Sequence, residues 1–253
     1  GAGIDPLGFY EGIKKGQEET FLSTIGHFDF FGTYLVMIFG LASGVYVFGK
    51  KAIARIAAAI CAIVLALGMA VSRTDSALLG MNLVCLAIAA QSGGDYMKMA
   101  RAASLWGVCF AVLPAARAIA AVSVYQPQFT GLPLMLCETY AAHMFTALFL
   151  ILAAVFMLLH KKGCHAPSKR VLMRTAFVLT VLAAAILIAA IVWFTIVDTA
   201  ADLGSAASFL RFDDMWGSVR GFVYKRSIRA FSDFSWKEKL FGRGLGTTLT
   251  TLT

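Results

Sequence analysis

Long apolar segments alternate with short polar connections along most of the chain. Their approximate ranges are 30–49, 52–71, 76–91, 102–125, 137–160 and 172–197. Runs of about 20 apolar residues match the thickness of a bilayer core, where a helix satisfies its own backbone hydrogen bonds. The pattern predicts an all-α polytopic membrane protein with about six transmembrane helices. Composition agrees, because 59% of the 253 residues are hydrophobic and only 14% are charged.

More polar segments flank the predicted bundle on both sides. We expect an extracytoplasmic N-terminal segment over 1–29, the bundle over 30–197 and an extracytoplasmic tail over 198–253. In the tail, apolar side chains recur with the spacing of one helix face, which predicts a helix there. The chain opens on glycine without the pattern of a signal peptide. We therefore expect it to be a piece of a longer protein.

Basic residues gather in every second connection. These residues are Lys50, Lys51 and Arg55, then Lys98 and Arg101, then Lys161, Lys162, Lys169, Arg170 and Arg174. By the positive-inside rule these connections are cytoplasmic, and the connections at 72–76 and 125–135 lie outside with both flanking segments. The net charge of +8 then reflects orientation, and we expect no nucleic-acid partner. The outward tail breaks the rule with eight basic residues. This exception indicates export regardless of charge, an anionic ligand that uses these charges, or an error in the sixth predicted span.

One arginine lies inside a predicted span. In "FAVLPAARAIAAVSVY", Arg117 stands about eight residues from the outer end of the segment. An unpaired guanidinium there costs at least about 3 kcal/mol, so it needs a partner or a wet cavity. Glu138, near the outer end of the next span, is one candidate partner. An outward cavity that holds an anionic ligand is the other interpretation.

Two further arginines lie on the predicted outer side. Arg73 and Asp75 share the tight turn between the second and third spans, where Arg73 either pairs locally and reaches lipid phosphates or binds a ligand. Arg220 follows Trp216 by four residues, so both lie on neighbouring positions of the tail helix. That helix either faces the outer mouth of the bundle or lies on anionic lipid as an interfacial helix. His143 is in the outer half of the fifth predicted span.

Cofactor and metal sites are not indicated. The five cysteines form no CxxC pair, and the outward segments have no cluster of histidine and carboxylate residues with ligand spacing. We expect no disulfide framework, no metal and no cofactor.

Three separated stretches of the sequence match motifs of a known family. Their order and spacing match along nearly the whole chain. They are "STIGHFDFFGTYL" (23–35), "SRTDSALLG" (72–80) and "GSVRGFVYKRSIRAFSDFSWKEKLFGRGLGT" (217–247). Together they resemble the O-antigen ligase and polymerase family of bacterial envelope glycosyltransferases. The family has a Gly-Asn-x-Asn start, a Ser-Arg followed by small residues, and an arginine about twenty residues before a glycine-rich turn.

The chain departs from this family pattern at two places. Gly26-His27-Phe28-Asp29 replaces the double asparagine. The family also carries a histidine beyond the glycine turn, which is thought to activate the acceptor hydroxyl. The chain ends at Thr253 before such a residue, so the catalytic base is either absent or lies outside this chain, and the resemblance implies missing spans at both ends.

The resemblance implies an enzyme of the bacterial cytoplasmic membrane, multi-pass, with its active face outward. It would transfer or polymerise glycan from a polyprenyl diphosphate-linked donor to a hydroxyl of a glycan or lipid-linked sugar acceptor. Arg73 and Arg220 are then the candidates for the catalytic role, because guanidinium groups stabilise a departing diphosphate without a metal. The expected substrate-binding residues are Arg117, Asp75, Glu138, His143 and Trp216.

Two other classes of function fit the same residues. A transporter or flippase for an anionic lipid-linked glycan would also place arginines in an outward cavity. Such transporters often contain internal repeats, and the sequence shows none. A structural or sensory membrane subunit would use the tail only to lie on lipid, and the intramembrane Arg117 argues against it.

Overall fold

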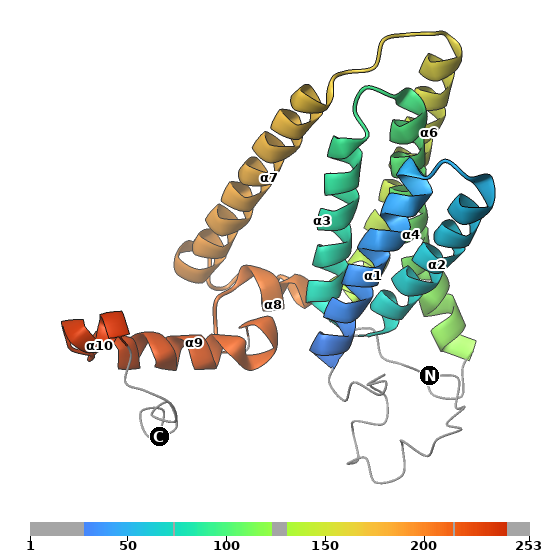
Figure 1. Cartoon of the computed structure of the whole chain (residues 1–253). Coiled ribbons are helices and arrows are strands. Elements are labelled where there is room, and N and C mark those ends of the chain that lie inside the picture. The colour runs from blue at the N-terminus through green and yellow to red at the C-terminus, as the bar shows by residue number, and fades with distance from the viewer. Residues whose placement is uncertain (1–27, 73, 123–130, 215, 242–253) are drawn as a thin grey trace. The chain divides into compact units, whose positions relative to one another are not determined.

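The computed structural model describes residues 28–72, 74–122, 131–214 and 216–241 (Figure 1). Every regular element in these ranges is a helix, which confirms the predicted all-α class. The elements are α1 (Phe28–Phe48), α2 (Ala52–Val71), α3 (Asp75–Gln91), α4 (Tyr96–Val122), α5 (Gly131–Glu138), α6 (Ala141–Lys161), α7 (Lys169–Val192), the π-helix η1 (Trp193–Val197), the 3-10 helix η2 (Gly204–Ala206), α8 (Ala207–Leu210), α9 (Trp216–Ser232) and α10 (Trp236–Phe241).

Five helices in the described ranges are long and apolar enough to cross a membrane. They cover Phe30–Phe48, Ala52–Val71, Tyr96–Ile119, Ala141–Lys161 and Lys169–Val197. The third predicted span is the apolar helix α3, which has 17 residues. At 1.5 Å per residue α3 is roughly 25 Å long, slightly less than a bilayer core. The chain is therefore a multi-pass membrane protein.

The fourth span begins earlier than predicted. Helix α4 starts at Tyr96, not near residue 102, so Lys98 and Arg101 belong to its first turns. The reason is local: the Asp95 carboxylate accepts a hydrogen bond from the Met97 amide (2.9 Å) and pairs with Lys98 (3.4 Å), as residues at a helix start do. The polar side chains of Asp95 and Lys98 stabilise the start of α4, so the helix begins before the apolar segment.

The fifth predicted segment, 137–160, is two helices. Helix α5 ends at Glu138 and α6 begins at Ala141. Between them, Tyr140 has a φ of 55°, the left-handed conformation that a residue with a Cβ adopts only at some cost. The prediction of one continuous span is therefore wrong at its outer end, and residues 137 and 138 belong to a separate short helix.

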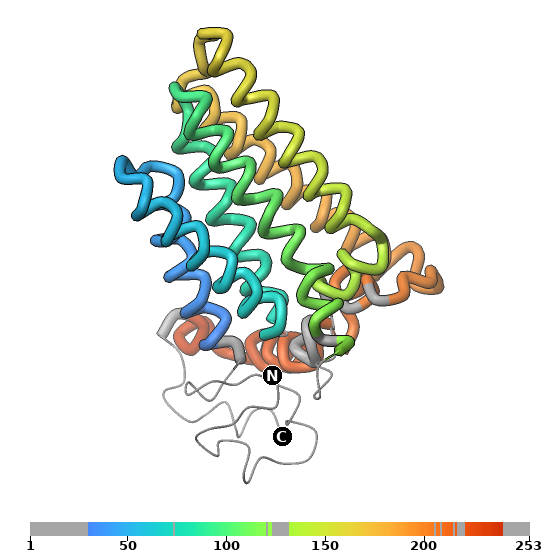
Figure 2. Tube along the Cα trace, turned by 90° about the vertical axis from the view of Figure 1, so that its right-hand side faces the viewer, coloured from blue at the N-terminus to red at the C-terminus, as the bar shows by residue number. Residues whose placement is uncertain are grey.

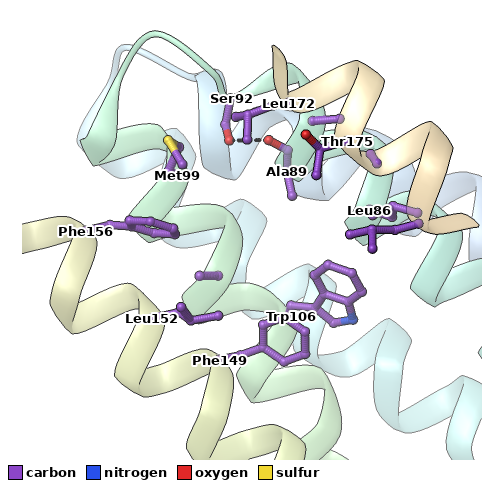
Figure 3. Close-up of a pocket in the computed structure, with 14 residues that line it drawn as sticks. Leu86, Ala89, Ser92, Met99, Trp106, Phe149, Leu152, Phe156, Leu172 and Thr175 are labelled. Carbon is purple, nitrogen blue, oxygen red and sulfur yellow. Dashed lines mark hydrogen bonds between the residues drawn. The ribbon is translucent and has the colours of Figure 1, made fainter. Parts of the chain in front are cut away.

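The chain divides into two compact units, Gly1–Thr180 and Val181–Thr253, with the boundary inside α7. In the first unit α4 lies along α6 (Figure 2). The rings of Trp106 and Phe149 are stacked between them, with their centroids 4.4 Å apart (Figure 3). Helices α1 and α3 approach closely because Gly32 leaves space: a Cβ there would lie 3.0 Å from that of Ala77. In a bilayer the hydrophobic effect does not drive helices together, and small residues favour helix association because they let the backbones approach closely.

In the second unit, polar contacts fold the chain back on the end of α7. Arg211 donates hydrogen bonds to the carbonyls of Phe194 (3.4 Å) and Ala201 (2.7 Å). The Phe212 amide donates to the Thr195 hydroxyl at 2.9 Å. The predicted tail helix is α9, which runs crosswise to the C-terminal half of α7 (Figure 1).

Candidate functional site

The first unit has two chemically different ends. At one end, called the basic end, lie the connections 49–51, 92–95 and 162–168, which contain three lysines, and the adjoining helix turns, which contain further lysines and arginines. At the other end, called the turn end, lie the turn between α2 and α3, the C-terminus of α4 and the short helix α5 (Figure 1). The predicted site residues of this unit belong to the turn end.

The turn between α2 and α3 is packed into the bundle. Ser72 and Thr74 have only 0% and 3% of their surface exposed. The Ser72 hydroxyl donates to the Met69 carbonyl (2.8 Å), and the Thr74 hydroxyl donates to the Ser72 carbonyl (3.2 Å). These bonds fix the backbone on both sides of Arg73. Arg73 itself lies outside the described residues.

Asp75 connects this turn to α5. Its Oδ1 accepts a hydrogen bond from the backbone amide of Leu132 at 2.8 Å, across 57 residues of sequence. The carboxylate thus satisfies an amide in the first turn of α5, where helical donors have no partner in their own helix. Asp75 also begins α3, where a negative charge is favourable. This contact gives Asp75 a positioning role that the sequence did not predict.

Arg117 and Glu138 meet at a cysteine. Burial raises the pKa of the Cys137 thiol, while the positive charge of Arg117 and a hydrogen bond with its side chain oppose that rise. The Glu138 carboxylate adds a smaller rise. In the described part of the chain Arg117 and Glu138 form no salt bridge, so the predicted alternative of an intramembrane ion pair is not what the structure contains.

Arg117 lies in the last two described turns of α4. Helix α4 ends at Val122, five residues after Arg117, which is about 8 Å along the helix axis. Its side chain is exposed in the structure. The guanidinium can therefore reach the interface region at lower cost than one at the bilayer centre.

His143 is separate from this group. It lies in the first turn of α6, its side chain is exposed, and its ring is 6.1 Å from that of Tyr140. Its side chain forms no hydrogen bond with another described residue. The structure therefore brings together Asp75, Arg117 and Glu138 around α5, and leaves His143 beside them on the next helix.

Trp216 and Arg220 belong to the second unit. The Trp216 indole N–H donates to the Phe209 carbonyl at 2.9 Å, and its ring lies 5.3 Å from that of Phe212. Trp216 therefore helps to fold the tail, a role that the sequence did not predict. Arg220 is one turn further along α9, directly before the buried Gly221, and its side chain lies outside the described part of the chain.

Two residues of the turn end were not predicted from sequence. Cys137 is the partner of Arg117, and Leu132 is the partner of Asp75. One local signal was present in "GLP" at 131–133, because proline is favoured in the first turn of a helix. This signal marks the start of α5 and would have predicted a short helix separate from the next span.

At the turn end, the cationic side chain of Arg117 thus lies beside the short helix α5. The Asp75 carboxylate, from the neighbouring turn, holds α5 through its hydrogen bond. A guanidinium in this place can bind an anion and stabilise developing negative charge. Among the described residues no group of histidine, cysteine and carboxylate side chains could hold a metal ion. Comparison of the chain with models of protein families, with curated proteins and with solved structures found no match.

Proposed function

We propose that the protein is a membrane glycosyltransferase of the O-antigen ligase and polymerase type. It transfers or polymerises glycan from a polyprenyl diphosphate-linked donor to a hydroxyl of a glycan or lipid-linked sugar acceptor. The proposal includes a bacterial cytoplasmic membrane, with the turn end on the outer side.

The observation that carries the proposal is the cationic Arg117 held beside α5 at the turn end. The stretch 72–80, one of the three that resemble the family, lies at the same end of the same unit. Arg117 acts on the Cys137 thiol and forms no salt bridge with a carboxylate in the described part of the chain, so its positive charge is available to a ligand. A guanidinium with five N–H donors suits a diphosphate.

In this reaction, most of the developing negative charge lies on the leaving group. An acceptor hydroxyl oxygen attacks the anomeric carbon, a new C–O bond forms, and the C–O bond to the diphosphate breaks. The proton of the hydroxyl passes to a base, and the polyprenyl diphosphate departs with the electron pair. Fixed guanidinium groups stabilise that departing charge, and we assign this role to Arg73 and Arg220, with Arg117 in donor binding.

The test is glycan transfer in proteoliposomes with a synthetic polyprenyl diphosphate-linked oligosaccharide and a sugar acceptor. Arg73→Ala and Arg220→Ala should each lower the rate about a hundredfold or more, because each removes a transition-state contact of about 3 kcal/mol. Arg→Lys should restore part of the rate, since an ammonium keeps the charge without the planar fork. Lys161→Ala, at the basic end, is the matched control and should keep the wild-type rate.

The same vesicles separate this proposal from a transporter or flippase. If the labelled donor crosses the membrane intact and no diphosphate is released, the protein moves the lipid-linked glycan and does not cleave it. Normal transfer by the Arg220 variant, with the tail detached from the membrane, would instead assign α9 to lipid anchoring.

A further inference from the structure

The segment that leads into α9 is held at the end of the last membrane span. That span covers Lys169–Val197, and its C-terminal part belongs to the second unit together with α9. The Phe212 amide donates to the Thr195 hydroxyl at 2.9 Å, two residues before the span ends. From this place α9 runs crosswise to the C-terminal half of α7 (Figure 1). A helix with this start and this direction follows the membrane surface.

Helix α9 carries too much charge to cross the bilayer core. Its 17 residues include Arg220, Lys225, Arg226 and Arg229. Charged side chains are unfavourable at the centre of a bilayer. The candidate spans of the described ranges also do not include α9. The helix therefore lies outside the hydrocarbon core, where it contacts either water or the head-group region.

One side of α9 is apolar and open. Tyr224, Ile228 and Phe231 follow each other at a spacing of four and three residues, so they share one face of the helix. These side chains are 45%, 64% and 51% exposed, respectively. Arg226 and Arg229 lie on the opposite side of the helix. Such a division is typical of a helix that lies in the membrane surface, with its apolar face about 5–10 Å deep.

Two ammonium groups lie beside exposed aromatic rings at the end of this helix. The Lys239 Nζ is 5.7 Å from the ring centroid of Phe231 and donates to the Ser232 carbonyl at 3.1 Å. The Lys237 Nζ is 5.9 Å from the ring centroid of Trp236, which is 65% exposed. An aromatic ring favours the boundary between acyl chains and head groups, where a neighbouring ammonium group can reach a phosphate. The α9–α10 surface comprises the apolar face and these groups: Tyr224, Ile228, Phe231, Trp236, Lys237 and Lys239.

Charge indicates which lipids fit this surface. Residues 216–241 contain six basic and two acidic side chains, an excess of four positive charges. Membranes with anionic lipids attract such segments, and each lysine or arginine near the membrane adds to the attraction. A partner protein would also cover an apolar face, but the bilayer already adjoins the end of the span from which α9 starts. An anionic lipid surface is therefore the partner that both position and charge favour.

We propose that the α9–α10 surface binds to the surface of a bilayer that contains anionic phospholipids. Its four apolar side chains lie among the upper parts of the acyl chains, and Lys237 and Lys239 bind phosphate groups. The tail is then anchored along the membrane instead of extending into water. The proposal does not rest on glycan transfer. It is compatible with a role of Arg220 in transfer, because the diphosphate of a polyprenyl lipid lies in the same surface.

The first experiment places a fluorescent label on either side of α9 in the full chain, reconstituted in nanodiscs of phosphatidylcholine with a minor share of phosphatidylglycerol. The exposed Cys61 and Cys164 are first changed to serine. A label at Ile228→Cys should be quenched by lipids that carry a spin label in the acyl chain, and it should be shielded from aqueous iodide. The neighbouring Arg229→Cys is the matched control, and its label should show the reverse.

The second experiment tests the two lysines. Changing Lys237 and Lys239 to glutamine should lower the ratio of lipid-bound to released α9 on the order of twentyfold, at roughly fivefold per charge. Lipid quenching of the Ile228→Cys label measures this ratio as the share of phosphatidylglycerol is varied. The control changes the exposed pair Lys50 and Lys51 of the first unit to glutamine and should have little effect. Circular dichroism and gel filtration check that each variant is folded.

The same labels show how the proposal can fail. An Ile228→Cys label open to iodide would place the apolar face in water, and a label shielded from both quenchers would place it against protein. Equal losses in the two double-lysine variants would mean that Lys237 and Lys239 do not bind the lipid. Equally strong lipid quenching in pure phosphatidylcholine would show that anionic lipid is not required. Any of these results would overturn the proposal.

Discussion

The contact between Asp75 and α5 leads to a prediction about local opening of the turn end. The Asp75 carboxylate accepts a hydrogen bond from the Leu132 amide at 2.8 Å. A hydrogen bond to a charged group contributes about 1.5–3 kcal/mol. Asp75→Ala removes this contribution, so the fraction of molecules in which α5 has left its place should increase roughly ten- to hundredfold. Asp75→Asn keeps an oxygen acceptor without the charge and should lie between the two.

A native cysteine reports this opening. Cys137 has only 7% of its surface exposed, so its thiol should react with a maleimide mainly when α5 opens. The exposed Cys61 and Cys164 are first changed to serine, because they would react in the folded protein. When opening is fast relative to modification, the rate of labelling follows the open fraction. Asp75→Ala should thus speed the labelling of Cys137 by roughly ten- to hundredfold.

Ser76→Ala is the matched control, because Ser76 is the exposed neighbour of Asp75 at the start of α3. It should leave the labelling rate unchanged. If Asp75→Ala labels Cys137 at the wild-type rate while the protein remains folded, then other contacts hold α5 and Asp75 has no positioning role. If both variants speed labelling equally, the effect comes from general disturbance of the turn.

Three further predictions concern packing and charge. Gly93→Ala should destabilise the protein by about 1–3 kcal/mol in thermal unfolding, because the added Cβ meets the α7 backbone, whereas Gly44→Ala has open space and should be neutral or slightly stabilising. Trp106→Phe leaves an amide oxygen of α3 without its donor and should cost about 0.5–2 kcal/mol in the same measurement. Cys137→Asp places a carboxylate beside Arg117 and should weaken binding of a polyprenyl diphosphate-linked donor in a vesicle binding assay. The Cys137→Ser variant should bind the donor normally. Equal binding by both variants would show that Arg117 does not contact the diphosphate.

The helices in lipid were predictable because their signal is strong and local. The range 52–71 was predicted from apolar residues alone, and α2 covers Ala52–Val71. Charged residues near the membrane edge misled the prediction of α4. Lys98 pairs with Asp95, and the Arg101 guanidinium donates to the Val47 carbonyl at the end of α1 (3.3 Å). Each charge has a partner within the protein, so neither interrupts the helix, and only the fold shows such partners.

The candidate site was predictable by residue type but not by contact. The sequence picked out Arg117, Glu138 and Asp75 as unusual charges near one side of the membrane, and the structure places all three around α5. It did not identify Cys137, because hydrophobic periodicity does not tell which side chains of two helices meet. Whether Arg73 and Arg220 act on one diphosphate stays a prediction.

The partner of Arg117 decides what its charge can do. A guanidinium paired with a carboxylate has no net charge to offer, and a diphosphate would have to displace the acid and leave it without a partner. A thiol is neutral below its ordinary pKa, and burial moves the pKa of Cys137 upward, so this neighbour does not cancel the charge of Arg117. A guanidinium also has five N–H donors, so a neighbouring thiol leaves most of them to a ligand. The thiol beside Arg117 therefore leaves its charge in place, which an anion-binding residue requires and a structural ion pair does not provide.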